Sequence, residues 1–345
     1  MPSSTSSFKF RRRPLHRFAI VSLLGVVSLA ALGLEGLSRF GLKRFSGFHQ
    51  RFEGERDVVL SELRPHLAAP GLLMVGNSLL LEGVNFKDLH NALAPEVRAY
   101  RYLIIQTGFY DWYYGLDRLF KQGIRPQYVV LGLSPRQLVQ SNIRGDYTAH
   151  YLFDLPGILD YSRREHFTLT QTSTLAFANV SALYATRSET RTTLMERLLP
   201  AYGTALQNLA SGSNPAPTPQ QIAQSGAEHL KLLKDLCAAY GAKAIFVLPP
   251  TMNPMDNEVR EAGREAGITV LAPAYFLSAD RSQFGPDAVH LHKLSRPVFT
   301  EELAQDLIAE FRSNPAQLGV VSSATDITAE PLSLPAADDA TKHPH

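Results

Sequence analysis

Short apolar runs alternate with amphipathic segments along residues 71–313 of this chain. Five of the runs are bounded by Gly, Pro or polar residues, and several are rich in β-branched or aromatic residues, which is typical of strands. They lie at residues 72–78, 97–104, 127–133, 242–250 and 268–273. Because the runs are close to continuously apolar, they indicate strands that are buried on both faces of a sheet.

Segments with apolar residues at helical spacing separate the predicted strands. They lie at residues 110–123, 226–241, 256–267 and 296–313. The first two end at glycines, Gly123 and Gly241, which suit a helix C-terminus. Strands alternating with helices predict a parallel sheet covered by helices on both faces. We therefore expect an α/β fold, a flavodoxin-like three-layer α/β/α sandwich with about five parallel strands.

One long segment, residues 136–225, interrupts the alternation. It contains a helical pattern, SALYATRSETRTTLMERLLP, and a stretch rich in Pro, Ser and Asn, SGSNPAPTPQQ. We interpret it as a helical insertion with a flexible return loop, whose length and position would suit a lid that excludes water. Residues 314–345 lack periodicity and are predicted to be a disordered tail.

The N-terminal part has the features of a membrane anchor. Residues 18–34 contain no charge, and their number is at the short end of the roughly 17–25 residues that a spanning helix needs. Basic residues in 1–17 favour a cytoplasmic N-terminus by the positive-inside rule, namely Lys9, Arg11, Arg12, Arg13 and Arg17. The cluster of Arg39, Lys43 and Arg44 after the run opposes this orientation.

We expect a single-pass signal anchor in the inner (cytoplasmic) membrane. A juxtamembrane helical segment would follow at 35–70, and the domain would face the periplasm or the cell exterior. The alternative is a cleaved signal peptide, for which the sequence SLAAL offers a site.

Composition narrows the choice of partners and cofactors. A hydrophobic content of 45% and a charged content of 19% describe a chain that can bury a core. The net charge of +2 gives no reason to expect nucleic acid as a partner. The only cysteine, Cys237, excludes an internal disulfide, and its helical surroundings predict a small buried apolar residue. No metal or organic cofactor is implied.

A small polar triplet marks the end of the first predicted strand. Residues 72–75 are apolar, Gly76-Asn77-Ser78 follow, and the chain is apolar again at 79–81. One interpretation is a plain strand-to-helix turn, in which Gly76 makes the bend and Asn77 or Ser78 caps a helix. The other is a nucleophile held on a turn at the carboxyl edge of a parallel sheet, where ligands bind in such folds.

A serine nucleophile needs a base, and a candidate lies near the C-terminus. The stretch FGPDAVHLHKLSRP contains Asp287 and His290 in a predicted loop between the last strand and the last helix. A carboxylate beside an imidazole holds its tautomer and stabilises the imidazolium that forms on proton abstraction. Two other interpretations stay open: a surface turn with incidental histidines, and a metal pair of His290 and His292, which lacks the partners of a zinc site.

Together these motifs resemble those of the SGNH (GDSL-like) hydrolase superfamily. Its first block reads Gly-Asp/Asn-Ser and its last block contains Asp-x-x-His; the matching segments here are 76–78 and 287–290. The resemblance implies that Ser78 is the nucleophile, His290 the general base and Asp287 the residue that orients His290. A generic α/β domain, in contrast, would leave Ser78 Oγ beyond the reach of about 3 Å that proton transfer to His290 requires.

The resemblance, which covers about residues 70–313, is incomplete where the superfamily binds the oxyanion. Its second block contributes a glycine N–H, and Gly108 stands at that place after the second strand. Its third block, Gly-x-Asn-Asp, is missing, and LGLSPRQL stands there instead. The implied oxyanion donors are the N–H groups of Ser78 and Gly108, with Arg136 or Ser134 in place of the missing side chain.

Four further residues are candidates for lining the substrate pocket. Tyr110 and Trp112 lie in FYDWYYG directly after Gly108, and aromatic faces suit sugar rings or acyl chains. Asn253 follows the fourth predicted strand, and Asn77 adjoins the candidate nucleophile. The alternatives are an aromatic helix face packed on the sheet and, for Asn253, a simple turn.

The sequence Ser-Pro-Arg after the third strand and an anchor in front are similar to anchored SGNH-like proteins of envelope polysaccharide O-acetylation and of D-alanyl transfer. This resemblance implies a membrane-anchored serine ester hydrolase or O-acyltransferase that acts on an acylated cell-envelope glycan or lipid. It also allows an acyl-donating membrane protein as a partner. The alternative is a non-catalytic SGNH-like scaffold that binds glycan or a partner in an envelope assembly.

Overall fold

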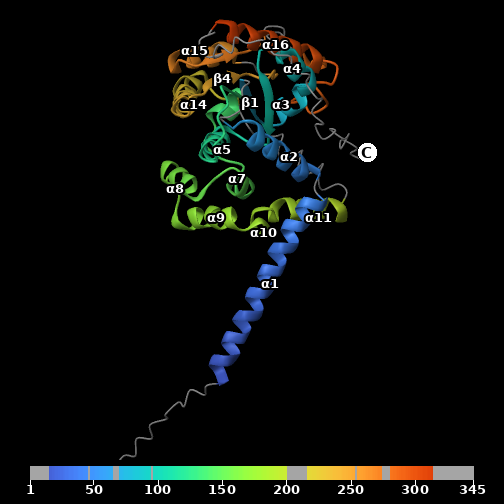
Figure 1. Cartoon of the computed structure of the whole chain (residues 1–345), viewed down its shortest axis with the longest axis vertical. Coiled ribbons are helices and arrows are strands. Elements are labelled where there is room, and N and C mark those ends of the chain that lie inside the picture. Colours follow the sequence, from blue (N-terminus) through green and yellow to red (C-terminus); the bar gives the residue numbers. More distant parts are fainter. Residues whose placement is uncertain are drawn as a thin grey trace, which may run out of the picture.

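The structure, a computed structural model, describes residues 15–45, 47–64, 70–94, 96–199, 216–252, 255–273 and 280–313. The predicted disordered tail, most of the basic N-terminus, Asn253 and part of the predicted return loop of the insertion lie outside the described residues. Figure 1 shows a layered body from which one long helix extends.

Five strands of the described chain form one parallel sheet. They are β1 (Gly71–Gly76), β2 (Arg98–Leu103), β3 (Tyr128–Gly132), β4 (Lys243–Val247) and β5 (Thr269–Leu271). Their order across the sheet is β2-β1-β3-β4-β5, so the direction of winding reverses beside β1. Ligands of open α/β sheets bind outside the carboxyl ends of the strands at such a reversal. The predicted flavodoxin-like sandwich is confirmed, and each predicted strand overlaps one of the five.

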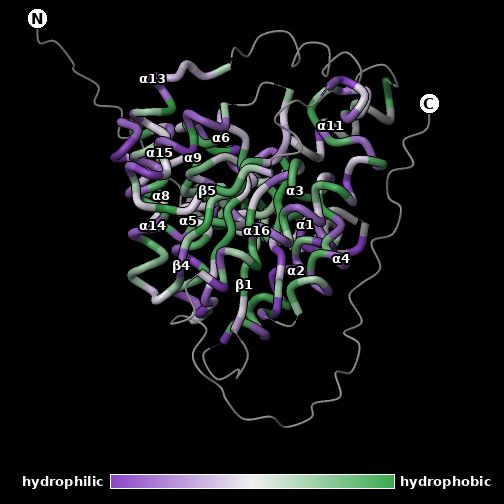
Figure 2. The backbone as a smooth tube through the Cα atoms, turned by 90° about the horizontal axis from the view of Figure 1, so that it is seen from above, coloured by the Kyte–Doolittle hydropathy of each residue, from purple (hydrophilic) through white to green (hydrophobic). Residues whose placement is uncertain are grey.

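Helices cover both faces of this sheet because successive strand residues point to opposite sides. Leu73 and Val75 of β1 belong to one apolar cluster, which includes residues of the helices α2, α5, α14 and α15. Leu72 and Met74 belong to the other, beneath α3, α4 and α16. The tube of the central strands is coloured mostly hydrophobic in Figure 2, as burial on both faces requires.

The helices of the two outer layers include one in each of the four segments that the sequence pattern predicts. Their bounds are α2 (Gly47–Glu62), α3 (Ser78–Gly83), α4 (Phe86–Leu93), α5 (Phe109–Lys121), α14 (Ala227–Ala239), α15 (Asp256–Ala266) and α16 (Arg296–Ser313). The glycines expected after α5 and α14, Gly123 and Gly241, have positive φ angles of 97° and 77°. Cys237 is fully buried in α14, as predicted, and burial raises the pKa of its thiol to about 12.

The N-terminal helix α1 (Leu15–Phe45) extends away from the body (Figure 1). Its segment Phe18–Gly41 is long and apolar enough to cross a membrane, and its large apolar side chains are exposed. The next helix, α2, is held on the sheet by Glu55, whose carboxylate accepts hydrogen bonds from Arg101 Nε at 2.8 Å and from the N–H of Leu103 at 3.0 Å. The chain therefore passes from α1 directly into the packed domain.

The segment between β3 and β4 is helical, as expected for the insertion. Its helices are α6 (Pro135–Val139), α7 (Asp146–Tyr151), α8 (Leu155–Arg164), α9 (Leu169–Val180), α10 (Ala182–Ala185), α11 (Arg187–Leu198), α13 (Pro219–Gln221) and the π-helix η1 (Ile222–Gly226). Helices α9, α10 and α11 form a row that crosses the domain end of α1 (Figure 1). Helix α9 packs on α7 and α8, and α10 packs on α1. That this segment acts as a lid stays a prediction.

Candidate active site

Ser78 is the first residue of α3, directly beyond the carboxyl end of β1. The turn before it needs glycine, because a Cβ on Gly76 would lie 2.5 Å from the carbonyl oxygen of Gly132 on β3. Asn77 is the N-cap: its Oδ1 accepts the N–H of Leu79, and its Nδ2 donates to the carbonyl of Thr107. The turn therefore caps a helix and also presents the serine hydroxyl at the sheet edge.

His290 lies between Ser78 and Asp287 in a continuous line of hydrogen bonds. Its Nε2 is 2.9 Å from Ser78 Oγ, and its Nδ1 is 2.6 Å from Asp287 Oδ2. Both contacts are satisfied when Nδ1–H donates to the carboxylate and Nε2 accepts from the hydroxyl. The Ser78–His290 distance is within the reach of proton transfer, which a generic α/β domain does not predict.

The turn that carries the histidine is held by the carboxylate of Asp287. Its Oδ1 accepts the N–H groups of Val289 and His290, and Ala288 takes a left-handed φ of 59°. Partial burial raises the pKa of Asp287, but hydrogen bonds from the His290 ring and from these two N–H groups lower it by more. The pKa of Asp287 is therefore below its ordinary value. Asp287 is therefore a carboxylate at neutral pH.

Neighbouring contacts fix the same loop against the body. The N–H of Gly285 donates to the carbonyl of His290 at 2.7 Å, and Phe284 forms an isolated antiparallel bridge with Leu291. Both apolar residues of the bridge are buried in the cluster beneath α16. His292, in contrast, is exposed, and no metal-binding group of His, Cys, Asp and Glu is found among the described residues.

Glu82 is a second acidic neighbour of His290 that the sequence analysis did not identify. Its Oε2 lies 3.9 Å from His290 Nδ1. Residues four apart share one face of a helix, so Glu82 projects from α3 on the same side as Ser78. That spacing was the available signal in the sequence.

Gly108 was expected to donate its N–H to the oxyanion, but in this structure that N–H is engaged. Its N–H donates to Asp111 Oδ2 at 2.8 Å at the start of α5, and it is therefore not free to hold an oxyanion. The same carboxylate accepts the N–H of Arg144 from the insertion at 3.2 Å. Burial raises the pKa of Asp111 to about 6, because it outweighs hydrogen bonds from Thr148, Gly108 and Arg144.

Ser134 and Arg136, the two candidate oxyanion donors after β3, differ in whether their side-chain donors are already engaged. The hydroxyl of Ser134 caps α6 and pairs with Gln137, whose Oε1 also accepts the N–H of Ser134. Its donors are thus engaged within the turn. Arg136 lies in the first turn of α6 and is half-buried, and its side chain makes no hydrogen bond or ion pair with the described residues. Of the two, only the Arg136 side chain is available as a donor.

Three residues expected to contact substrate are buried instead. Asn77 and Trp112 have no exposed surface, and Tyr110 is 3% exposed. Trp112 Nε1 donates to Thr107 Oγ1 at 2.8 Å, which supports the loop that holds Asn77. Tyr110 packs on Tyr161 in the core. The expectation that these three line the pocket is wrong, because their polar atoms and rings are used inside the fold.

The loop between β2 and α5 contains one exposed residue, Gln106, that no sequence motif singles out. Gln106 has a left-handed φ of 60°, which is uncommon for a residue other than glycine. It precedes Thr107, whose carbonyl binds Asn77. Such strained positions cluster at functional sites, so Gln106 is a candidate for the rim of the site.

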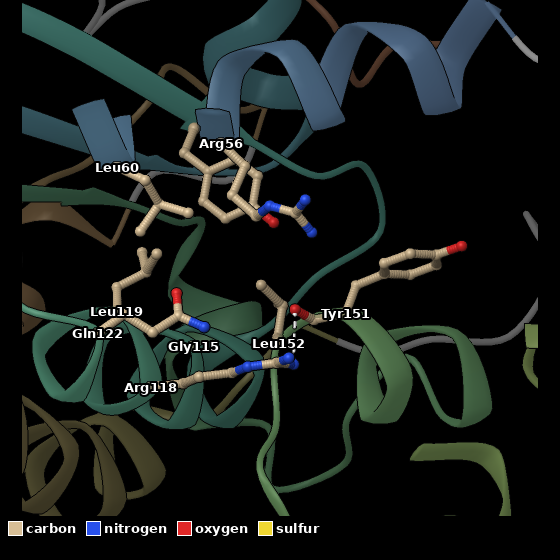
Figure 3. Close-up of a pocket in the computed structure, with 9 residues that line it drawn as sticks. Arg56, Leu60, Gly115, Arg118, Leu119, Gln122, Tyr151 and Leu152 are labelled. Carbon is tan, nitrogen blue, oxygen red and sulfur yellow. Dashed lines mark hydrogen bonds between the residues drawn. The ribbon is translucent and has the colours of Figure 1, made fainter. Parts of the chain in front are cut away.

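A cavity of about 270 Å³ lies apart from these residues. It opens between α2, α5 and the end of α7, and none of the residues that line it belongs to the Ser78 site (Figure 3). Arg118 lies at its wall and donates to the carbonyls of His150, Tyr151 and Phe153. The cavity marks the place where α5 holds the insertion.

Comparisons with known proteins were made for sequence and structure. No protein-family model matches this sequence, and no curated protein matches it. Among solved structures, the psychrotrophic esterase EstA from Pseudoalteromonas sp. is similar at 12% identity and a TM-score of 0.38, over 71% of this chain and 99% of that chain. TesA is similar at 12% identity and a TM-score of 0.35, over 69% and 97%.

The strand order places Ser78 at the reversal point of the sheet, and the Asp-x-x-His segment meets it there. The chain thus has a flavodoxin-like α/β/α fold whose sheet edge brings Ser78, His290 and Asp287 together.

Proposed function

We propose that this protein is a membrane-anchored serine ester hydrolase or O-acyltransferase that acts on a cell-envelope glycan or lipid. The observation that carries the proposal is the hydrogen-bonded line from Ser78 through His290 to Asp287. Ser78 and His290 are 212 residues apart in the sequence. Chance placement of the two motifs would not bring a hydroxyl, an imidazole and a carboxylate into the order that nucleophilic catalysis needs.

In the proposed reaction, Ser78 Oγ attacks the acyl carbonyl carbon while its proton passes to His290 Nε2. The resulting imidazolium is stabilised by the Asp287 carboxylate. Collapse of the tetrahedral intermediate breaks the ester bond, and His290 gives the proton to the leaving alkoxide. Water or an acceptor hydroxyl then attacks the acyl-serine by the same route in reverse, which gives hydrolysis or transfer.

The oxyanion would be held by the N–H of Ser78 and by the guanidinium of Arg136. Ser78 lies in the first turn of α3, where N–H groups have no carbonyl partner inside the helix. Arg136 follows the carboxyl end of β3, the strand paired with β1. A cation at this position would compensate for the missing Gly-x-Asn-Asp block and for the engaged N–H of Gly108.

The anchor would keep the enzyme beside substrates in the envelope. The segment Phe18–Gly41 spans the membrane in this proposal, with the domain on the periplasmic or exterior side because basic residues precede the helix. An acylated glycan or lipid would be the substrate, and an acyl-donating membrane protein is the partner that a transferase would require.

A non-catalytic scaffold that binds glycan or an assembly partner is the second candidate. The observation that favours it is the state of the oxyanion donors, since the N–H of Gly108 and both donors of Ser134 are already engaged. Loss of one such donor typically costs about 10²–10³ in rate. This candidate predicts that Ser78→Ala leaves function unchanged.

Labelling of the full chain in detergent with a serine-reactive fluorophosphonate tests the proposal. We expect the wild type to be labelled, and Ser78→Ala and His290→Ala to lose labelling. The matched control is His292→Ala, an exposed neighbour that should keep it. A folded wild type that remains unlabelled, or labelling that persists in Ser78→Ala, would contradict the proposal.

A further inference from the structure

Helix α9 and α10 belong to an uncharged segment on the surface of the domain. Residues 167–186, FTLTQTSTLAFANVSALYAT, contain no Asp, Glu, Lys, Arg or His. Charged residues stand at both ends of the segment: Arg163, Arg164 and Glu165 precede it, and Arg187, which pairs with Asp146, follows it. A surface helix of a domain surrounded by water normally carries charges on its outer face.

Large apolar side chains cover the outer face of this segment. Leu169 is 86% exposed, Phe177 and Val180 are each 55% exposed, and Leu183 is 40% exposed. The first three follow helical spacing along one side of α9, while Leu175 and Ala178 on the opposite side are buried. The segment is thus apolar on its outer face as well as on the face that packs against the domain.

Contacts with α1 place this face at one end of the apolar span. The Glu35 carboxylate accepts the N–H groups of Ala182 at 2.8 Å and Leu183 at 3.1 Å, and the hydroxyl of Ser181 at 2.9 Å. Arg39 Nη2 donates to the carbonyl of Val180 at 3.2 Å. Both α1 residues lie in the last part of the Phe18–Gly41 segment, and the row of α9 and α10 crosses α1 at this level (Figure 1).

We propose that α9 and α10 lie in the headgroup region of the membrane that α1 spans, with Leu169, Phe177, Val180 and Leu183 at the boundary with the acyl chains. This inference rests on the membrane anchoring proposed above. A bilayer fits the face better than a protein partner, because the spanning helix itself brings lipid to Val180 and Leu183. The basic residues at the ends of the segment suit anionic headgroups.

The contact of α9 and α10 with the headgroups would fix the orientation of the domain relative to the membrane. A single spanning helix leaves its domain free to tilt and rotate, whereas a second element in the interface restricts both. The insertion would then act as a platform that holds the Ser78 site at a set height above the bilayer. Lipid-linked substrates would meet the site in one orientation.

Fluorescence quenching in vesicles tests the platform directly. The full chain is reconstituted in phosphatidylethanolamine and phosphatidylglycerol, with single cysteines introduced as Phe177→Cys or Val180→Cys and labelled with an environment-sensitive fluorophore. Cys237 is buried and is kept, and the unsubstituted protein serves as the blank. Leu29→Cys in α1 reports the spanning segment, and Lys231→Cys, exposed on α14, reports the aqueous side.

Lipids that carry a nitroxide near the headgroup should quench the labels at 177 and 180 at least fivefold more than the label at 231. An aqueous iodide quencher should show the reverse order. If Leu29 is quenched by nitroxide lipid and the labels at 177 and 180 behave like that at 231, the platform is overturned while the anchor stands. If Leu29 is not quenched by lipid, the anchor and the platform both fall.

Discussion

At the scale of single residues, the position of Ser78 depends on the residues around it that do no chemistry. Gly76 lets β1 approach β3, and Asn77 ties the start of α3 to the carbonyl of Thr107. Trp112 in turn holds the Thr107 hydroxyl. Because these groups are buried and hydrogen-bonded, Ser78 is held by a rigid support, as the proposed catalysis requires.

Arg136 is the residue whose proposed role is most directly measurable. If its guanidinium holds the oxyanion, Arg136→Ala should lower kcat for an activated ester by about 10²–10³, with a smaller effect on KM. Arg136→Lys should recover part of the loss, because it restores a cation without the planar fork. Arg163→Ala, a change at an exposed site on α8, is the control. Wild-type turnover in Arg136→Ala would exclude the role.

At the scale of elements, Arg118 joins the insertion to the body. Its Nη1 donates to the carbonyls of His150, Tyr151 and Phe153, and the Phe153 carbonyl also accepts Asn179 Nδ2. We expect Arg118→Leu to lower the free energy of unfolding by about 3 kcal/mol, because buried carbonyls would lose their donor.

Urea unfolding, followed by the fluorescence of Trp112, measures that change, since Trp112 is the only tryptophan and is fully buried. Lys121→Met is the matched control on the same helix. Lys121 pairs with Asp117 and Asp154 near the surface, and exposed ion pairs contribute about 1 kcal/mol or less. Equal losses of unfolding free energy in Arg118→Leu and Lys121→Met would show that the hydrogen bonds of Arg118 contribute no more to stability than an exposed ion pair does.

The elements that the sequence predicted well are those whose signal is local. Each buried strand is a short apolar run, and α5 and α14 end near glycines whose φ angles are positive. Periodicity does not distinguish a buried aromatic face from a pocket rim, and this is why Trp112 and Tyr110 were placed wrongly. The contacts of Glu35 with the start of α10 join residues more than 140 positions apart, and no local sequence pattern predicts such contacts.

At the scale of the whole molecule, the topology of the sheet explains why the segments 76–78 and 287–290 could be expected to lie together. The carboxyl ends of parallel strands share one edge, so a serine after the first strand and a histidine before the last helix were expected to meet. The hydrogen bond that engages the Gly108 N–H depends on a single side chain, Asp111, which also accepts a backbone N–H from the insertion. That contact lies beyond what strand order can predict.

Asp111 also makes the stability of the whole molecule depend on pH. Its pKa is raised from 3.8 to about 6 by burial, so the folded protein binds this proton more tightly than the unfolded chain does. The contribution is fully present below pH 3.8 and is lost as the pH rises through about 6. Between pH 5 and pH 7 the free energy of unfolding should therefore fall by about 1 kcal/mol on account of this group.

Asp111→Asn isolates that contribution, because an amide has no proton to exchange in this range. The difference between wild type and variant in urea unfolding, followed by Trp112, should change by about 1 kcal/mol between pH 5 and pH 7, with the wild type losing more as the pH rises. A constant difference would mean that the Asp111 carboxyl is already ionised at pH 5. Its three backbone contacts would then be charge-assisted hydrogen bonds, and the bond that engages the Gly108 N–H would be correspondingly harder to break.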